Sequence, residues 1–435
     1  MTDRSNQLEV PDRTVSTLLQ IVRQFGTPTY AFDMQRMRSQ VEKLQSRLPA
    51  EVGLLYSLKA NASLGICDLF QECGIGADVA SAGELATAIE AGFSAEQFFV
   101  AGPFKLPETI SQLQDTPQAV VSIDSPSEFR SLSDIGLRNP VVLRLRPDFG
   151  SCAVVPAGCD SRFGFTGKDI AACRKELAAS ELNVIGFHVF AGSQILDTEK
   201  AIDHLSRSVD LSLRAADVLG ITATLINLGG GFGIPYGPTD EELDLEAIGT
   251  ELSRLVGRAA PARLVLELGR YLVAEAGWYL TSVVGHQTGQ GRRAVVVDGG
   301  VHQRADMCGL RLRTAANPPV VLDASAVVAA PPVVAGSPDQ ATTPIDVWGC
   351  LSLPDDILAE SSLLPPLSAG SVLAFSNAGA YGIWSSPALF HGSPLPAEVA
   401  FDGSTLHVMR ERKPAESILD GQQHLIQKNV AAHSS

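Results

Sequence analysis

The sequence is short of paired cysteines, basic charge and long apolar runs. Its seven cysteines in 435 residues are irregularly spaced and form no Cys-x-x-Cys pair, which disfavours a disulfide framework and favours reduced thiols in a cytoplasm. The net charge of −15 disfavours nucleic acid and anionic membranes as partners. No apolar run reaches the roughly 20 residues of a membrane-spanning helix. The polar residues 1–13 predict no signal peptide, so we expect a cytoplasmic protein.

Apolar residues are abundant, at 45% of the chain, which predicts a large globular core. Eight short β-rich runs alternate with amphipathic segments of helical length. Continuous apolar strands joined by helices imply a parallel sheet, and eight such units predict an α/β fold of the (β/α)₈ TIM-barrel type. The runs are 54–59, 76–80, 97–101, 119–123, 140–146, 184–190, 223–228 and 263–267.

The pattern changes near Trp278, where short strands separated by Pro/Gly/Ala-rich loops replace the helical segments. This change predicts a C-terminal all-β domain, antiparallel and barrel-like. We expect an N-terminal segment at 1–26, the barrel at 27–277, the β-domain at 278–412 and a polar tail at 413–435. The strand Thr29–Phe32 is a candidate to pair with the β-domain. The predicted strands of that domain are 294–298, 319–322, 343–348, 371–375 and 397–409.

Chemically capable residues follow the predicted barrel strands, at the ends where barrel enzymes carry their active sites. Taken alone, each has an ordinary explanation. The stem of Lys59 can lie along apolar surface, His188 can be a core histidine, Glu267 and Arg270 can form a structural ion pair, and the glycine run can be a flexible turn. Together, a lysine for an imine, a glycine loop for phosphate and a buried carboxylate describe a pyridoxal phosphate site. The residues are Lys59, Asp78, His188, the glycine run Gly229–Gly233, Glu267 and Arg270.

Five motifs together resemble the fold-type III, or alanine-racemase-fold, amino-acid decarboxylases, the family of the diaminopimelate, ornithine and arginine decarboxylases. The resemblance runs from Thr27 to Arg412, with the motifs in the family's order. The form His-Val-Phe-Ala-Gly-Ser-Gln is similar to the branch acting on carrier-protein-tethered or otherwise specialised substrates. The motifs are Tyr56–Asn61, His188–Gln194, Gly229–Gly233, Glu267–Arg270 and Asn377–Gly382.

The resemblance implies a role for each matching residue. Lys59 would form the Schiff base with pyridoxal 5'-phosphate, His188 would stack on its ring, and Glu267 would pair with the pyridine nitrogen. Arg270 and Tyr381 would also face the amino-acid substrate. The resemblance further implies a homodimer with shared active sites, and we expect no metal. The remaining implied cofactor contacts are Asp78, Ser193, Gly230, Gly231 and Gly269.

The loop Gly349–Asp356 departs from the family's pattern Gly-Pro-x-Cys-x-x-x-Asp. In the family, the cysteine and the aspartate of this pattern reach the active site of the partner subunit. Here Ser352 takes the cysteine position and Cys350 the proline position. A serine hydroxyl is a far poorer proton donor than a thiol. Three explanations are open: Cys350 takes the place of the family's cysteine in a reshaped loop, another group donates the proton, or the reaction is no longer simple decarboxylation. Cys350 is equally well explained as a small buried hydrophobic residue. Asp356 at the aspartate position, with Asp355 beside it, favours a basic substrate.

These observations predict a pyridoxal phosphate-dependent decarboxylase that releases CO₂ and an amine from an amino acid or its derivative. An amino-acid racemase on the same fold is one alternative, although family racemases place arginine where this chain has Glu267. A non-catalytic regulatory homologue, of the kind that antizyme inhibitors represent, is another. The altered loop allows it, but the retained Lys59 argues against it.

Overall fold

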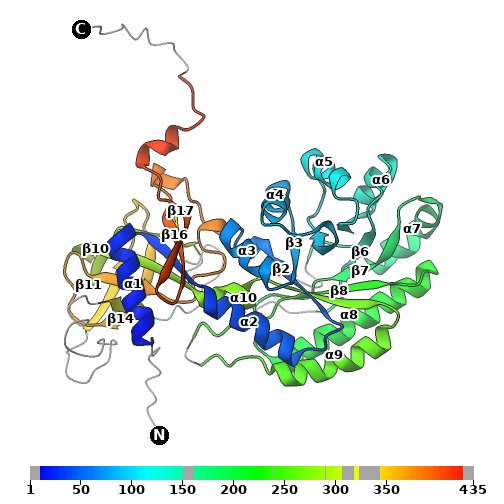
Figure 1. Ribbon diagram of the computed structural model, residues 1–435, viewed down its shortest axis with the longest axis horizontal. Coiled ribbons are helices and arrows are strands. Elements are labelled where there is room, and N and C mark those ends of the chain that lie inside the picture. Colours follow the sequence, from blue (N-terminus) through cyan, green and yellow to red (C-terminus); the bar gives the residue numbers. More distant parts are fainter. Residues whose placement is uncertain are drawn as a thin grey trace.

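The computed structural model describes residues 10–149, 161–237, 239–289, 291–305, 318–322 and 343–424. It has two parts, with the barrel and its helices on the right of Figure 1 and a second sheet on the left. No helix in these ranges is long and apolar enough to cross a membrane.

Eight parallel strands of the described chain close into the predicted barrel, and β2 pairs with both β3 and β9 to complete it. Every run expected as a barrel strand forms one. The strands are β2 (Gly53–Ser57), β3 (Gly76–Val79), β4 (Phe98–Val100), β5 (Val120–Ile123), β6 (Val141–Leu145), β7 (Val184–Val189), β8 (Leu225–Gly230) and β9 (Arg263–Leu268).

Helices cover the outside of the barrel, as parallel strands require. The helix α2 (Met34–Arg47) precedes the first barrel strand and packs against both α3 and α9, so it closes the helical layer. The others are α3 (Leu64–Glu72), α4 (Ala82–Glu90), α5 (Pro107–Asp115), α6 (Pro126–Asp134), α7 (Gly167–Ala179), α8 (Thr198–Leu219), α9 (Leu245–Ala259) and the short α10 (Arg270–Val273).

The described strands confirm the predicted β-domain as a mostly antiparallel, mixed sheet, in which β1 runs parallel to β16 and β11 runs parallel to β13. The N-terminal strand β1 also pairs with β10, so the two ends of the chain build one sheet. Its strands are β1 (Thr29–Asp33), β10 (Gly277–Gly289), β11 (Arg292–Val297), β12 (Val320–Leu322), β13 (Thr343–Trp348), β14 (Ile357–Leu364), β15 (Val372–Phe375), β16 (Ala397–Asp402) and β17 (Thr405–Arg410).

The helix α1 (Asp12–Phe25) lies along this sheet (Figure 1) and was not predicted. Its buried face includes Val15, Leu18 and Ile21, which share a core with Trp278 and Leu280 of β10. With buried Leu19, these apolar residues recur at spacings of three and four, which is a helical pattern and was a usable signal. Short 3₁₀ turns, also not predicted, occur at Leu58–Ala60, Ala95–Gln97, Ala274–Ala276, Ile383–Ser385, Phe390–Gly392 and Ala415–Leu419.

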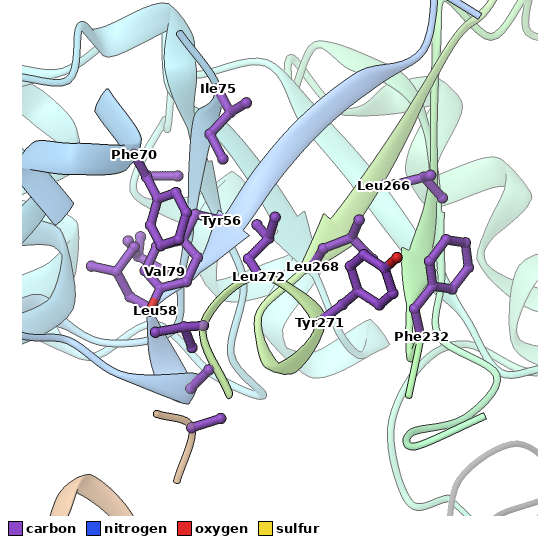
Figure 2. Close-up of a cluster of buried hydrophobic side chains, with 14 of the residues drawn as sticks. Tyr56, Leu58, Phe70, Ile75, Val79, Phe232, Leu266, Leu268, Tyr271 and Leu272 are labelled. Carbon is purple, nitrogen blue, oxygen red and sulfur yellow. The ribbon is translucent and has the colours of Figure 1, made fainter. Parts of the chain in front are cut away.

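A cluster of large buried side chains sets the direction of β2 as it leaves the barrel. Figure 2 shows Tyr56 beside Phe70 of α3, and the two ring centroids are 4.2 Å apart. The Tyr56 hydroxyl donates a hydrogen bond of 2.7 Å to the carbonyl of Asn61, which closes the turn after the strand. Because side chains alternate along a strand, neighbouring Ser57 points the other way and contacts Asp78.

A buried ion pair ties the second sheet to the chain just beyond this turn. Glu398 of β16 is almost fully buried and accepts hydrogen bonds from Ser63 (2.6 Å) and from Nε of Arg410 (3.0 Å). Ser63 directly precedes α3 of the barrel, so this carboxylate joins the two parts of the molecule.

Replacing Arg410 with alanine leaves Glu398 as a buried charge without its cation, a change that typically costs about 3–5 kcal/mol. We therefore expect Arg410→Ala to shift the urea unfolding midpoint strongly downward. Arg130→Ala is the matched control, because Arg130 and its partner Glu176 are both exposed, and its midpoint should stay at the wild-type value. Equal midpoints for the two variants would contradict the anchoring role.

Candidate active site

Lys59 lies in the 3₁₀ turn Leu58–Ala60 at the end of β2, and the second sheet holds the backbone of this turn. The Tyr381 N–H donates to the carbonyl of Ala60 (2.7 Å), and the Asn61 side chain donates to the carbonyl of Gly379 (3.0 Å). Lys59 therefore sits where the barrel mouth meets the second sheet, and both parts fix its position.

The Lys59 ammonium lies among acidic and aromatic groups. Its Nζ is 3.9 Å from Oδ2 of Asp78 and 5.3 Å from the ring centroid of Phe190. Burial lowers its pKa, but the carboxylates of Asp78 and Glu267 outweigh this effect and raise the pKa above the ordinary value. The side chain remains 46% exposed, so a ligand can reach the nitrogen.

Asp78 ends β3 beside Lys59 and is nearly buried. The Ser57 hydroxyl donates to its Oδ2, which fixes the carboxylate. Within the described chain, its Oδ1 has no hydrogen-bond partner. Because buried polar atoms are normally satisfied, this oxygen marks a place where a ligand donor fits.

Glu267 of β9 is the buried carboxylate at the centre of the site. Asn227 of the neighbouring strand β8 donates to its Oε1 (2.7 Å), and Nε2 of His188 lies 3.4 Å from the same oxygen. Burial, followed by the nearby charge of Asp78, raises the Glu267 pKa to about 8. Such a carboxyl is strongly stabilised by a cationic or N–H partner.

His188 of β7 is held on two sides. Its Nδ1 lies 2.9 Å from the Ser122 hydroxyl, and its ring meets the edge of Phe99 at a centroid distance of 5.3 Å. Burial and then the charges of Arg144 and Lys59 lower its pKa well below the ordinary value. The imidazole is therefore neutral, and its Nε2 has no hydrogen-bond partner in the described ranges.

The glycine run after β8 forms a cradle with no room for side chains. Gly229 and Gly231 have φ values of +66° and +88°, which favour glycine. A Cβ on Gly230 would strike the carbonyl of Glu267, and one on Gly231 would strike the carbonyl of Gly192. Backbone N–H groups that are free of side chains in this way suit an anion such as phosphate.

The turn containing Gly192, Ser193 and Gln194 is joined to the glycine run. The Ile195 N–H donates to the carbonyl of Gly231, and the Gln194 side chain donates to the carbonyl of Ile234 (2.6 Å). Ser193, expected as a phosphate contact, thus lies beside the cradle. Gln194 has a φ of +55°, and such backbone strain is common at ligand sites.

Arg270 begins α10 directly after β9 and is enclosed by two tyrosines. Its Nη1 donates to the Tyr236 hydroxyl (2.7 Å), and its guanidinium lies 4.7 Å from the Tyr381 ring centroid. Gly269 lets this segment pack against the Lys59 turn, since a Cβ there would lie 2.8 Å from that of Ala60. The predicted Gly269, Arg270 and Tyr381 therefore meet beside Lys59.

The departing loop lies in the second sheet, between β13 and β14. Asp356 is buried, and its two carboxylate oxygens accept hydrogen bonds from the backbone N–H groups of Val301 (2.7 Å) and Leu351 (2.9 Å). These contacts organise the loop and hold the carboxylate within its own chain. The expected contact of Asp356 with the distal end of a substrate stays a prediction.

Cys350, Ser352 and Asp355 of the same loop are exposed. The Cys350 thiol lies 3.7 Å from the carbonyl of Asp298, and burial followed by the charge of Asp356 raises its pKa. The loop lines a hollow of about 610 Å³ together with Trp348 and Arg292. These contacts are to the second sheet rather than to the barrel mouth of the same chain.

The described residues fit pyridoxal phosphate. The cradle at Gly229–Gly231 suits its phosphate, and the buried Glu267 carboxyl with its raised pKa suits a ring nitrogen. Oδ1 of Asp78 has no hydrogen-bond partner in the described chain and belongs to the carboxylate that lies beside Lys59. An accessible lysine amine completes the set.

Comparison with known proteins identifies the family. A family model described as "Pyridoxal-dependent decarboxylase, pyridoxal binding domain" matches residues 34–274. The chain is 31% identical over 411 residues to the L-glutamyl-[BtrI acyl-carrier protein] decarboxylase of Niallia circulans, covering 92% of this chain and 94% of that protein. It is 28% identical over 424 residues to the diaminopimelate decarboxylase of Methanothermobacter thermautotrophicus, covering 93% of both.

The fold agrees with solved structures. Diaminopimelate decarboxylase of Helicobacter pylori, complexed with L-lysine, superimposes with a TM-score of 0.81 at 22% identity, covering 93% of this chain and 98% of that one. The chain belongs to the pyridoxal-dependent decarboxylases. It is an enzyme of the carboxy-lyase class whose cofactor is pyridoxal phosphate.

Three residues of the site were not predicted: Ser122, Asn227 and Tyr236. Ser122 and Asn227 are single polar residues inside apolar strands, at Val-Val-Ser-Ile and Leu-Ile-Asn-Leu. A polar residue at a core position of a buried strand is a usable signal. Tyr236 follows the glycine run in a loop, where the sequence offers no such pattern.

The raised pKa of Glu267 makes the stability of the ligand-free protein depend on pH. Between pH of about 4.5 and about 8, folded Glu267 keeps a proton that the unfolded chain releases, so rising pH destabilises the fold in this window. Glu267→Gln cannot ionise. Its stability in urea, relative to wild type, should increase as pH rises through the window and change little below it. A difference that is independent of pH would contradict the assigned burial, and exposed Glu416→Gln serves as the control.

Proposed function

We propose that this chain removes the α-carboxyl group of an amino acid or amino-acid derivative and that Lys59 supplies the amine that holds the cofactor. The observation that carries this proposal is the placement of Glu267, with Asn227 and His188 on the same oxygen, at the barrel mouth that it shares with Lys59. A carboxylate opposite a ring nitrogen favours decarboxylation over racemisation, because it supports the greater build-up of electrons.

Pyridoxal phosphate, when bound, supplies a ring that accepts the electrons released as the carboxyl leaves. Glu267 would hold the ring nitrogen, His188 would lie against the ring face, and Gly230 and Gly231 would bind the phosphate. Asp78 would hold the Lys59 side chain in place beside the cofactor.

The reaction balances without an oxidant. The bond between the α-carbon and the carboxyl carbon breaks, CO₂ departs, and a proton from the enzyme or solvent returns to the α-carbon to give an amine. The proton donor must reach that carbon. Cys350 and Ser352 are candidates by position in the sequence, although their loop contacts the second sheet of its own chain.

We infer that this loop serves the site of a second copy and that the protein is a homodimer. The exposed Cys350 and Ser352 line an open hollow, which supports a contact across an interface. In a symmetric dimer each loop would then complete the partner's barrel mouth.

The substrate class that the site supports best is an acidic aminoacyl group attached to a carrier protein. Asp356, the carboxylate expected to bind a distal ammonium, is occupied by backbone N–H groups. Arginines lie on this side of the site instead. Arg144 lies 6.0 Å from the ring of Phe190, which Lys59 also contacts, and Arg144 and exposed Arg162 flank the ring of Phe163 at 5.0 and 4.9 Å. The named relative from Niallia circulans acts on a glutamyl carrier protein, which supports the same choice.

A cytoplasmic location is supported by thiols that are free within the described chain, among them Cys67, Cys73 and Cys173, since oxidising compartments favour disulfides.

Replacing Lys59 with alanine should abolish decarboxylation and the visible absorbance of protein-bound pyridoxal phosphate, because no other described side chain offers an amine at the mouth. Absorbance after gel filtration of the cofactor-loaded variant measures this directly. Lys43→Ala, a surface lysine paired with Glu242, should keep the wild-type spectrum. A Lys59→Ala protein that retained the full spectrum would refute the assignment of Lys59 as the cofactor-binding amine. A wild-type protein that lacked the absorbance of bound pyridoxal phosphate would favour a non-catalytic homologue.

The substrate class is tested by CO₂ release from the cofactor-loaded protein. We expect release from an L-glutamyl thioester of a carrier protein and little from free L-glutamate, L-lysine or diaminopimelate. Arg162→Ala should raise the KM of the thioester, since it removes one of the two cations that flank the ring of Phe163. Rapid release from a free basic amino acid would overturn the tethered substrate and leave decarboxylation intact.

Shared sites predict complementation between two inactive variants. Lys59→Ala lacks the lysine, and the double variant Cys350→Ala/Ser352→Ala lacks the loop donors. Mixed dimers carry one site with both, so random mixing in equal amounts should restore about a quarter of wild-type activity. No recovery from a mixture shown to contain mixed dimers would place the loop in its own chain's site.

A further inference from the structure

A buried lysine lies behind the site and has no part in the reaction described above. Lys105 precedes α5, and its side chain is 1% exposed. Its Nζ lies 3.2 Å from Oε1 of Glu128 and donates to the carbonyls of Gly102 (3.1 Å) and Ser122. All three hydrogens of the ammonium therefore have partners, and the charge is fixed in place.

The counter-ion Glu128 is equally buried and equally fixed. It lies in the first turn of α6, and its two oxygens accept hydrogen bonds from the backbone N–H groups of Lys105 (2.8 Å) and Asp124 (2.7 Å). A buried ion pair of this kind rarely adds stability over apolar side chains of the same size. Its retention therefore points to a purpose for the charge itself.

Ser122 connects this charge to His188. The Ser122 carbonyl accepts from Lys105, and its hydroxyl lies 2.9 Å from Nδ1 of His188. On the opposite side of the imidazole, Nε2 faces Oε1 of Glu267 at 3.4 Å. The other charged groups near the ring are Lys59, Arg144 and Asp124, the last paired with Arg144 at 2.9 Å.

A neutral imidazole carries its single proton on one nitrogen, and the surroundings select which. On the Ser122 side, the ammonium of Lys105 contacts the Ser122 carbonyl directly, whereas its counter-ion Glu128 bonds to Lys105 and the Asp124 backbone. This contact of the cation with Ser122 favours the lone pair at Nδ1, where the hydroxyl can donate. The carboxyl oxygen on the other side favours the N–H at Nε2. Both ends of the ring thus favour the same tautomer.

We propose that Lys105 and Ser122 are positioning residues that hold His188 in the Nε2–H tautomer, with its N–H directed at Glu267. The Asn227 amide donates to the same Oε1 of Glu267, and the His188 N–H faces that oxygen from 3.4 Å. Both groups therefore lie on the Oε1 side of the carboxyl and leave Oε2 for the cofactor ring nitrogen. This consequence for the reaction rests on the proposed function, whereas the tautomer itself does not.

Solid-state nitrogen NMR of ligand-free protein labelled with ¹⁵N-histidine tests the tautomer. The chain has eight histidines, and the His188 signals are those missing from His188→Asn. We expect wild-type His188 to show an unprotonated Nδ1 and a protonated Nε2. Ser122→Ala should shift the ring toward the other tautomer, while Ser208→Ala, an equally buried serine on α8, should not. Wild-type His188 protonated at Nδ1, or Ser122→Ala with unchanged shifts, would overturn the proposal.

Lys105 is tested by removing the ion pair as a unit, since Lys105→Met alone strands Glu128 and risks misfolding. Lys105→Met/Glu128→Gln should move the tautomer in the same direction as Ser122→Ala. In the loaded enzyme both changes should lower kcat by about tenfold and leave KM near its wild-type value, because they alter the orientation of Glu267 rather than substrate binding. A double variant with wild-type His188 shifts would overturn the part assigned to Lys105. The NMR result holds whether or not the substrate proposal fails.

Discussion

The structure depends on one constraint: Glu267 is a carboxyl group buried inside a barrel mouth, where an isolated negative charge is costly. Its surroundings compensate for this only in part. Asn227 donates to one oxygen, His188 stays neutral beside it, and the pKa rises to about 8. A ring nitrogen that carries or shares a proton supplies the missing partner, so burial of this group without a fixed counter-ion is itself a binding determinant for the cofactor.

The active site also depends on the contacts between the barrel and the second sheet. Lys59 stands on a turn whose carbonyls and amides are bonded to Gly379 and Tyr381, and Tyr381 in turn lies over Arg270. The lysine, the cation and the cradle are therefore positioned by residues that are hundreds of positions apart. Neither part of the molecule alone therefore contains a complete site.

The sequence was sufficient for the barrel because each strand is a continuous apolar run and each strand end carries a distinctive residue, as at Lys59 and Glu267. It was insufficient where position depends on register between strands. Asn227 contacts Glu267 across the neighbouring strands β8 and β9, whereas Ser122 of β5 reaches His188 of β7 past the strand β6 between them. Both contacts depend on how the strands align, and no local pattern encodes that alignment. The same holds for Asp356: the sequence names the carboxylate but not the backbone N–H groups of Val301 and Leu351 that bind it.

The central claim is that this site breaks the bond to the α-carboxyl group rather than only exchanging the α-hydrogen. Mass spectrometry of the turnover products in deuterium oxide tests it most directly, with an L-glutamyl carrier thioester and a panel of free amino acids as substrates. Decarboxylation predicts an amine that has lost CO₂ and carries one deuterium on the former α-carbon. Recovery of the intact amino acid with deuterium at its α-carbon and its carboxyl group retained would contradict decarboxylation and identify a racemase.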